Sequence, residues 1–310
     1  MSKKLRRWLS LALILLLLAG VGPPLYREAQ WLCRERNWSR RVHSSGEETV
    51  MAYAKAHGYS LRDWPESLIA LLDRNPETKD FVLSYPAEHT RQQEVDLSRE
   101  LSAEGVPLFL QWDKRWGYLQ YGSDMAGLTG CGPTCLSMVA CYLTGDAAHS
   151  PDNMIRFALD NGYCSPGNGS SWTLISQGAG KLGLTATELP LVKKTIFSHL
   201  EAERPVICVM GPGDFTASGH FIVMTGLKDG LICVNDPNSR ANSQKLWDFD
   251  QISDQIRNLW MLEKAPVGSQ VFVKQLNQKF NYFTASVRRG WLNKVSDTWF
   301  DNRVSLLFYP

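Results

Sequence analysis

The feature that most constrains the fold of this chain is a segment with two apolar runs around a tight-turn signal. Residues 220–237 read HFIVMTGLKDGLICVNDP, and the pair Asp229-Gly230 lies near their midpoint. Asp-Gly between two apolar runs is a strong signal for a β-hairpin. The sequence therefore predicts two adjacent antiparallel strands here. Together with helices earlier in the chain, antiparallel strands favour an α+β fold over alternating parallel units.

A second constraint lies in residues 127–139, GLTGCGPTCLSMV, which place two cysteines one helical turn apart. Proline is tolerated in the first turn of a helix, so Pro133 predicts a helix that begins at or near Cys131. Free backbone N–H groups and the helix dipole favour a thiolate there and lower the pKa of its thiol. Cys135 falls on the apolar face and is predicted to belong to the core. We expect Gly130 and Gly132 to leave room for another backbone.

A nucleophilic thiolate needs a base, and the base needs a group that orients it. The predicted hairpin offers both, because His220 opens its first strand and Asp236 closes its second. Directly opposed residues of antiparallel strands have Cβ atoms about 5 Å apart, so we expect the two side chains to lie together. A carboxylate beside an imidazole selects its tautomer and stabilises the imidazolium. A histidine on an apolar strand is by itself weak evidence for a catalytic site. Its combination with the cysteine and the aspartate is stronger evidence.

These residues resemble a known family. The segments GCGPTCLSMV, SGHFIVMTG and VNDPNS, in this order, are similar to those of the C39-like cysteine peptidases, which have a papain-like fold. The segments QWDKRW and GSSW are similar to stand-alone members without a transporter domain. The resemblance covers residues 106–262 and implies a papain-like α+β domain that hydrolyses a peptide bond through an acyl-enzyme.

The resemblance also implies the roles of particular residues. Cys131 would be the nucleophile, His220 the general base and Asp236 the orienting carboxylate. Gln111 is the matching position for the oxyanion-hole glutamine, with the Cys131 backbone N–H as second donor. In the bacteriocin-processing members this glutamine lies only a few residues before the cysteine, whereas Gln111 lies much farther upstream. Further candidates, for substrate binding, are Gly130, Trp172 and Gly219.

The N-terminus predicts a membrane segment. A basic cluster at residues 3–7 precedes the apolar run WLSLALILLLLAGVG, which is the order of an export signal. No clear cleavage site follows, so we expect an uncleaved signal-anchor in residues 1–26, with the catalytic domain outside the cytoplasm. Secretion is the alternative if the signal is cleaved, and a buried core helix is a further one. Several arginines between residues 27 and 41 weaken the orientation, because they place positive charge on the other side too.

The remaining chain divides into three further regions. Residues 27–104 are expected to form a helical stalk and accessory helices. Their helices are predicted near residues 47–57, from Pro65 onward, and from Asn75-Pro76 to a point before Pro86. An aromatic-rich strand and loop then begins the peptidase domain of residues 105–264, which contains a helix near residues 170–184, a buried strand in RPVICVMG and a closing helix and strand. Residues 265–310 form a tail of unknown role.

Composition excludes some classes of function. The formal net charge of +2 over 310 residues gives no indication of nucleic-acid binding. The seven cysteines contain no Cys-x-x-Cys pair, so their spacing does not favour a zinc site, and we expect neither metal nor cofactor. Seven is an odd number, so at least one thiol is free or pairs outside the chain. The oligomeric state is left open.

The expected partners are therefore a peptide or protein substrate and a membrane. Three alternatives to a membrane-tethered peptidase stay open. The same triad would serve a cell-wall peptide amidase or transpeptidase. The domain would alternatively be a non-catalytic papain-like binding module. Cys131 and Cys135 would alternatively form a redox disulfide, although their placement across a helix start is awkward for that bond.

Overall fold

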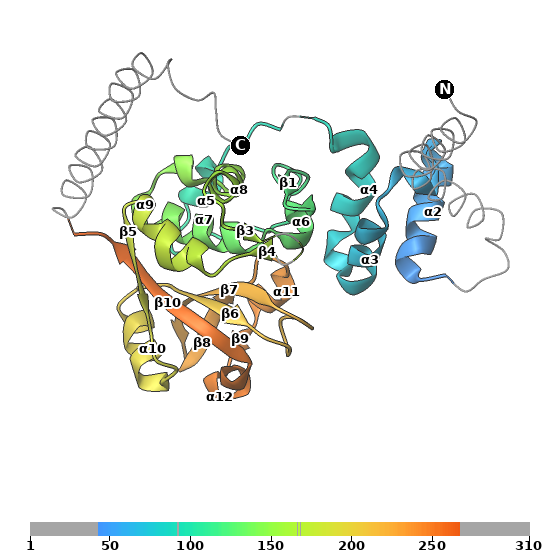
Figure 1. Ribbon diagram of the computed structural model, residues 1–310. Coiled ribbons are helices and arrows are strands. Elements are labelled where there is room, and N and C mark those ends of the chain that lie inside the picture. Colours follow the sequence, from blue (N-terminus) through green and yellow to red (C-terminus); the bar gives the residue numbers. More distant parts are fainter. Residues whose placement is uncertain (1–42, 92, 166, 168, 267–310) are drawn as a thin grey trace, which may run out of the picture.

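A six-stranded antiparallel sheet between two helical layers forms the centre of the computed structural model, which describes residues 43–91, 93–165, 167 and 169–266 (Figure 1). Mixed helix and sheet of this kind confirm the α+β expectation. The strands, in spatial order, are β5 (Leu184–Glu188), β10 (Ile256–Lys264), β6 (Val206–Met210), β7 (His220–Lys228), β8 (Leu231–Asn235) and β9 (Leu246–Trp247).

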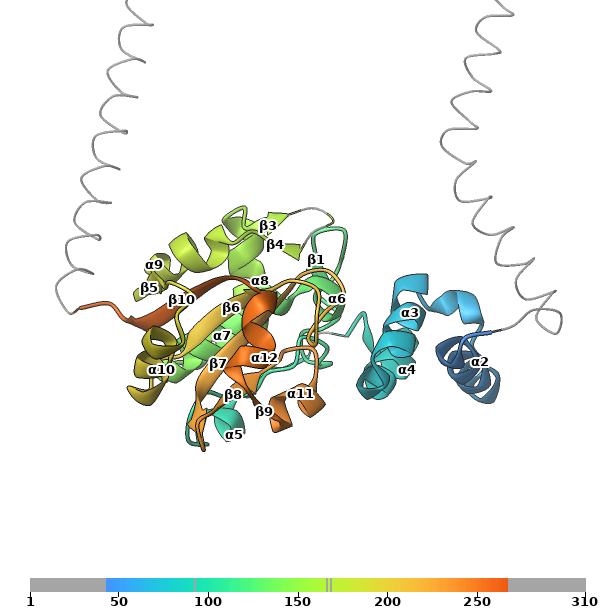
Figure 2. The same ribbon diagram turned by 90° about the horizontal axis from the view of Figure 1, so that it is seen from below.

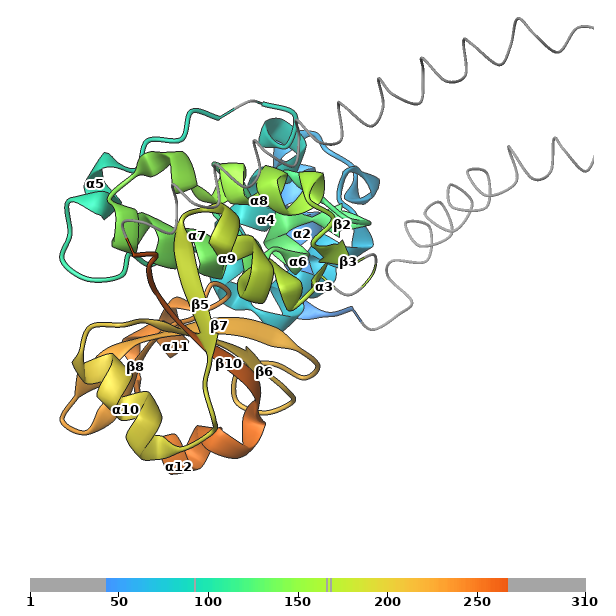
Figure 3. The same ribbon diagram turned by 60° about the vertical axis from the view of Figure 1, so that its left-hand side comes forward.

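Both faces of the sheet are buried, which explains why its central strand is apolar along its whole length. On β6, Ile207 and Val209 join the core beneath α7, whereas Val206, Cys208 and Met210 join a second core on the opposite face. Successive strand residues point to opposite faces, so one continuous apolar run serves two cores. In Figure 3, α7 (Cys131–Thr144), α8 (Pro151–Asp160) and α9 (Ala179–Lys181) lie on one side of the sheet; α10 (Lys193–Glu201) and α12 (Phe249–Ile252) lie on the other.

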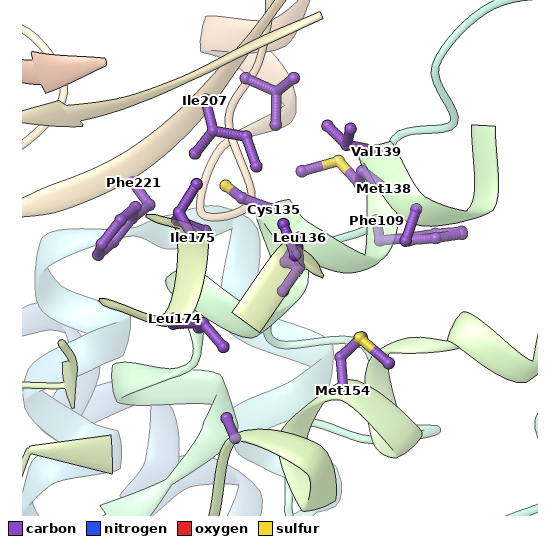
Figure 4. Packing of buried hydrophobic residues seen from close by; sticks show 14 of the residues in the cluster. Phe109, Cys135, Leu136, Met138, Val139, Met154, Leu174, Ile175, Ile207 and Phe221 are labelled. Atoms are coloured by element: carbon purple, nitrogen blue, oxygen red, sulfur yellow. The ribbon is translucent and has the colours of Figure 1, made fainter. Parts of the chain in front are cut away.

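Helix α7 is the centre of the first core. It begins at Cys131, as Pro133 predicts, and ends at Gly145, whose φ of 71° is the left-handed conformation that glycine adopts readily at a helix end. Figure 4 shows Cys135, Met138 and Val139 packed among buried apolar side chains, including Ile207 of the sheet. The helix therefore carries Cys131 on a rigid, well-packed support.

The predicted hairpin is present. Lys228 pairs with Leu231, which leaves Asp229 and Gly230 as a two-residue turn with φ angles of 53° and 75°. Both angles are positive, the condition that makes Asp-Gly favourable there. The register then shifts between Met224 and Gly226, a bulge that the sequence did not reveal.

The accessory helices precede the sheet domain in the chain and lie beside it in space (Figure 2). Their buried apolar residues form a third cluster that extends into the sheet domain. They are α2 (Ser45–His57), η2 (Leu61–Asp63), α3 (Glu66–Arg74), η3 (Pro76–Thr78) and α4 (Lys79–Glu88). The cluster joins the apolar stripe of α3 to Leu110 and Trp112, and Phe81 stacks on Tyr118. The stripe of α3 is thus buried, in part, against the following domain.

One predicted helix end is wrong. Helix α4 does not stop before Pro86 but continues through it to Glu88. Proline removes the hydrogen bond that its N–H would donate to the carbonyl four residues earlier, which is that of Val82. In the structure this carbonyl accepts a 2.7 Å hydrogen bond from the Trp64 indole N–H, so it is not left unpaired in the buried cluster. A side chain distant in sequence therefore makes the proline tolerable.

Two further segments differ from expectation. The residues preceding Trp116 form turns rather than a strand, and the first short strand is β1 (Gln120–Tyr121). The helix predicted near residue 174 is present, but its first part, η5 (Leu174–Gly178), is a π-helix. The remaining elements are α5 (Ser98–Leu101), β2 (Asp124–Met125), α6 (Ala126–Thr129), η4 (Ala147–His149), β3 (Cys164–Ser165), β4 (Gly169–Ser170), α11 (Arg240–Gln244) and η6 (Ser253–Gln255).

The expected signal-anchor of residues 1–26 and most of the expected tail lie outside the described residues. Within residues 43–91, 93–165, 167 and 169–266, helices are too short or too polar to span a bilayer. The predicted boundaries of the four regions stay predictions.

Candidate active site

Three side chains predicted to act together converge where α7 meets the sheet. Cys131 is the first residue of α7, His220 is the first residue of β7, and Asp236 directly follows β8. His220 Nε2 lies 2.7 Å from Asp236 Oδ1, and both residues are buried. The same imidazole interacts with the thiol of Cys131 and lowers its pKa. Because Nε2 is occupied by the carboxylate, Nδ1 is the ring nitrogen left for the sulfur.

The route by which Asp236 reaches the imidazole differs from the expected one. Val223 pairs with Asn235, so the position directly opposite His220 would fall beyond Asp236. Instead, the chain leaves β8 after Asn235 and turns, with a bridge between Asp236 and Ser239. The carboxylate is thus placed by a turn after the strand, and not by direct cross-strand opposition as predicted.

Both oxygens of the Asp236 carboxylate have donors besides the imidazole. Oδ1 also accepts from the backbone N–H of Asn238 at 2.8 Å, and Oδ2 accepts from Asn242 Nδ2 at 2.8 Å. Several donors fix the orientation of a buried carboxylate. Sequence reasoning missed Asn242. The residue belongs to α11, a five-residue helix whose position beside the site depends on the turn after β8.

The pKa of the Cys131 thiol is lowered by its surroundings. Burial by itself disfavours the thiolate and raises the pKa, but the hydrogen bond and charge of His220 oppose it. The backbone N–H groups of Phe221 and Gly132 also lower the pKa. The net result is a Cys131 pKa below the ordinary thiol value. The first turn of a helix supplies such N–H groups, as the sequence predicts for this position.

The pKa of the His220 imidazole shifts upward, opposite to that of the thiol. Burial alone would lower its pKa, yet the charge of Asp236 and the hydrogen bonds to Asp236 and Cys131 raise the pKa well above the ordinary histidine value. A lowered thiol pKa and a raised imidazole pKa favour the thiolate–imidazolium ion pair. The site is therefore poised for nucleophilic attack by sulfur.

Gln111 reaches the same site despite its distance along the chain. Its backbone N–H donates to the carbonyl of Pro237 at 2.8 Å, which joins its turn to the segment after Asp236. The side chain is buried, Nε2 donates to the carbonyl of Gly127 at 3.0 Å, and Oε1 has no partner among the described residues. One amide N–H of Gln111 is therefore left to act as a donor beside Cys131.

A pocket of about 870 Å³ contains the catalytic candidates in its lining. Cys131, His220 and Gln111 line it together with Ser170, and so do the predicted substrate-binding residues Trp172 and Gly219. Trp172 has an exposed fraction of 45%, so it does not lie in the core. It packs edge-on against Trp260 with ring centroids 6.2 Å apart.

Gly130 and Gly132 were expected to leave room for another backbone, and Gly130 does so for a backbone of the same protein. A Cβ on Gly130 would lie 2.6 Å from the carbonyl oxygen of Ala126 in α6, and Gly130 is not part of the pocket lining. A Cβ on Gly132 would lie 2.6 Å from the Cβ of Ser170. Both glycines make room for neighbouring parts of the same protein, so the substrate-binding prediction for Gly130 is not supported by its position.

Other cysteine chemistry has less support. The six cysteines of the described residues are all free thiols, Cys131 and Cys135 included. Among the described residues, no group of three or more His, Cys, Asp or Glu side chains is arranged to hold a metal ion. Cys33 lies outside the described residues.

A protein-family model and solved structures match this chain. The family described as Peptidase_C39 like family matches residues 103–265, the segment that contains all four catalytic candidates. Two solved structures are similar. The peptidase domain of Streptococcus ComA, a bi-functional ABC transporter involved in a quorum sensing pathway, has 18% identity and a TM-score of 0.35. That match covers 44% of this chain and 92% of the domain.

The second similar structure is a putative C39-like peptidase from Bacillus anthracis, with 16% identity and a TM-score of 0.33. The match covers 52% of this chain and 96% of that protein. No curated protein matches this chain.

Proposed function

The chain belongs to the Peptidase_C39 like family, and from this premise we propose that it is a cysteine peptidase that uses Cys131, His220 and Asp236. The observation that carries the proposal is the convergence of these three side chains: Cys131 and His220 line one pocket, and the buried Asp236 contacts the imidazole of His220. Acyl transfer by a cysteine nucleophile needs a thiolate beside an imidazolium that is itself oriented by a carboxylate.

The proposed reaction begins from the ion pair. The Cys131 thiolate attacks the carbonyl carbon of a peptide bond and forms a C–S bond, while the C=O electron pair moves to the oxygen. Collapse of this intermediate breaks the C–N bond, and the imidazolium of His220 gives its proton to the departing amine. Water then attacks the thioester, His220 accepts a proton from that water, and the carboxylic acid product leaves with the thiolate regenerated.

Two N–H donors are proposed to stabilise the oxyanion. One is the amide N–H of Gln111 that does not bond Gly127, and the other is the backbone N–H of Cys131 at the start of α7. Donors fixed by the fold stabilise the developing charge without reorganising. Gln111→Ala is therefore expected to lower the rate about 100- to 1,000-fold. A variant that keeps the full rate would remove Gln111 from the proposal.

Substrate binding is proposed for the pocket around these groups. Trp172 offers an exposed aromatic face for an apolar side chain of the peptide, and Gly219 lies on the loop that leads into His220. A Cβ on Gly219 would have no atom within 4 Å, so the space beside it is open. An extended peptide fits such an open pocket better than a small compact ligand does.

We also propose that the enzyme is tethered to the membrane by residues 1–26, with its catalytic domain outside the cytoplasm. This part of the proposal rests on the basic cluster and apolar run of the sequence alone. Carbonate extraction of membranes tests it. The full chain should stay in the membrane fraction until detergent is added, and release by carbonate alone would remove the tether from the proposal.

The peptidase activity is tested with the full-length chain and a mixture of unfolded proteins. Mass spectrometry of newly formed N-termini should find cleavages with the native protein that are absent with the Cys131→Ala variant. The recurring residues around those cleavages would define the specificity. The same set of N-termini from both proteins, or none from either, would contradict the proposal.

A further inference from the structure

The accessory helices contact the segment that holds the catalytic carboxylate. Asn75 separates α3 from η3, and its side chain donates from Nδ2 to the backbone carbonyl of Asn238 at 2.6 Å. The Trp112 indole N–H donates to the same carbonyl at 2.9 Å. Asn75 is 9% exposed, so this contact is largely shielded from water. Two donors therefore hold the backbone two residues after Asp236.

Glu77 in η3 hydrogen-bonds the three residues that follow Asn238. Its carboxylate accepts from the Ser239 hydroxyl at 2.7 Å, from the Arg240 N–H at 2.9 Å and from the Ala241 N–H at 3.3 Å. The two N–H groups belong to the first turn of α11, where backbone donors lack partners within the helix. One side chain of the accessory helices thus holds three consecutive residues.

The held segment, residues 236–242, is the one that positions the carboxylate. Asn238 donates its N–H to Asp236 Oδ1, and Asn242 donates its side-chain amide to Oδ2. Asp236 in turn contacts His220. From Asn75, hydrogen bonds therefore run through Asn238 and Asp236 to the imidazole. From Glu77 they run through the Ser239 hydroxyl, which accepts from the Asn242 N–H at 3.1 Å, and then through the Asn242 side chain to Asp236.

We propose that α3 and η3 form a clamp whose positioning residues, Asn75 and Glu77, hold the Asp236 carboxylate against His220. Neither residue lies within residues 103–265, so the clamp is supplied by a part of the chain that the family match does not include. The inference rests on the proposed function, since it assigns the accessory helices a role in that same site. Loosening the clamp lets the carboxylate move away from the imidazole, which weakens the ion pair with Cys131.

The test measures the alkylation rate of Cys131 by iodoacetamide against pH in the full-length chain. This rate follows the thiolate fraction and needs no identified substrate. In Glu77→Ala and in Asn75→Ser, the midpoint of the acid limb is expected to rise by about half a pH unit, which slows alkylation about threefold below the midpoint. Serine remains a good N-cap, so Asn75→Ser removes the contact to Asn238 and keeps the cap of η3.

Asp80→Ala is the matched control. It removes one negative charge from α4 and breaks the 2.9 Å ion pair between Asp80 and Lys114, but it does not touch residues 236–242. A clamp predicts an unchanged midpoint in this variant. Thermal melting of all variants shows how much each substitution loosens the fold, and Asn75→Ser carries the test if Glu77→Ala does not fold.

Two results would overturn the inference, and they are distinguishable. Midpoints that stay at the native value in both clamp variants, with melting temperatures lowered as in Asp80→Ala, would reduce the helices to a structural support. A native Cys131 that reacts only at the pH of an ordinary thiol would refute the ion pair, and with it both the proposed function and the clamp.

Discussion

The first and second turns of α7 each hold a cysteine, and the two thiols have opposite properties. Cys131 is half-buried at the pocket, where His220 and two backbone N–H groups lower its pKa. Cys135, one turn later, is fully buried in the apolar core, and burial raises its pKa well above the ordinary value. Both belong to the same helix and carry the same chemical group.

The difference teaches that helix position and environment, and not residue type, create the nucleophile. The first turn exposes N–H groups that have no partner inside the helix, and it meets the strand that begins with His220. By the second turn, every backbone donor serves the helix and the side chains face the sheet. The following experiments would break or sharpen this comparison.

The largest expected effect is the loss of peptide cleavage in Cys131→Ala, by at least about 10,000-fold, because the reaction loses its proposed nucleophile. Cys135→Ala should keep cleavage within about threefold of native. It should lower the free energy of unfolding by about 1–2 kcal/mol, since it leaves a small cavity in the core. Cleavage assays and denaturant unfolding of the two variants measure this contrast. Equal losses of activity would refute the division of roles.

Removing the imidazole should erase most of the difference between the two turns. In His220→Ala, alkylation of Cys131 by iodoacetamide at neutral pH is expected to slow about 10- to 100-fold, because the thiolate loses its counter-charge. Cys135 should stay unreactive in both proteins, as its burial is unchanged. Peptide mapping after alkylation identifies the labelled residue. An unchanged Cys131 rate in His220→Ala would mean that the helix start alone creates the thiolate.

The pH dependence gives a third comparison. The Cys131 pKa is lowered, so its alkylation should begin at a pH below that of an ordinary thiol and stay high as pH rises. Peptide cleavage also needs protonated His220 for the leaving amine, so it should fall only above the raised pKa of that imidazole. Rates of both reactions across a pH series measure the two limbs. Cleavage that declines at the ordinary histidine pKa would contradict the raised value.

The smallest expected effects concern the support of the first turn. Gly132→Ala would force a Cβ against Ser170, whose hydroxyl lies 2.7 Å from the Tyr121 hydroxyl, and should cost about 1–3 kcal/mol of stability. Gly180→Ala, where a Cβ on α9 would meet no atom within 4 Å, should instead stabilise by about 0.5–1 kcal/mol. Thermal unfolding distinguishes the signs. An unchanged stability of the Gly132→Ala variant would show that Ser170 in β4 moves aside at little cost.

Local rules explain which structural predictions succeeded. Asn75-Pro76 as a helix start, Pro133 in a first helical turn and Asp229-Gly230 as a turn are each decided by a few adjacent residues. The predictions that failed depend on distant partners. Pro86 is accommodated because Trp64 bonds the carbonyl that it leaves unpaired, and no pattern near Pro86 indicates this.

The site divides in the same way. The start of α7 and the hairpin could be predicted from adjacent residues, so Cys131 and His220 were found by the chemistry of their positions. Gln111 was found by resemblance, because nothing in its own turn indicates a donor. Asn242 and Glu77 were missed, since their contacts with the Asp236 segment exist only after the turn beyond β8 has formed.

By itself, the sequence determined that a thiol opens a helix and that an imidazole opens the first strand of a hairpin. Those outcomes depend on proline geometry, helix-end donors and a two-residue turn, all of which act over a few residues. Only the tertiary structure decided which side-chain amide lines the pocket with Cys131 and which helices contact the segment that holds the carboxylate. Those contacts join segments far apart in the chain, and their positions depend on how complete elements pack against one another.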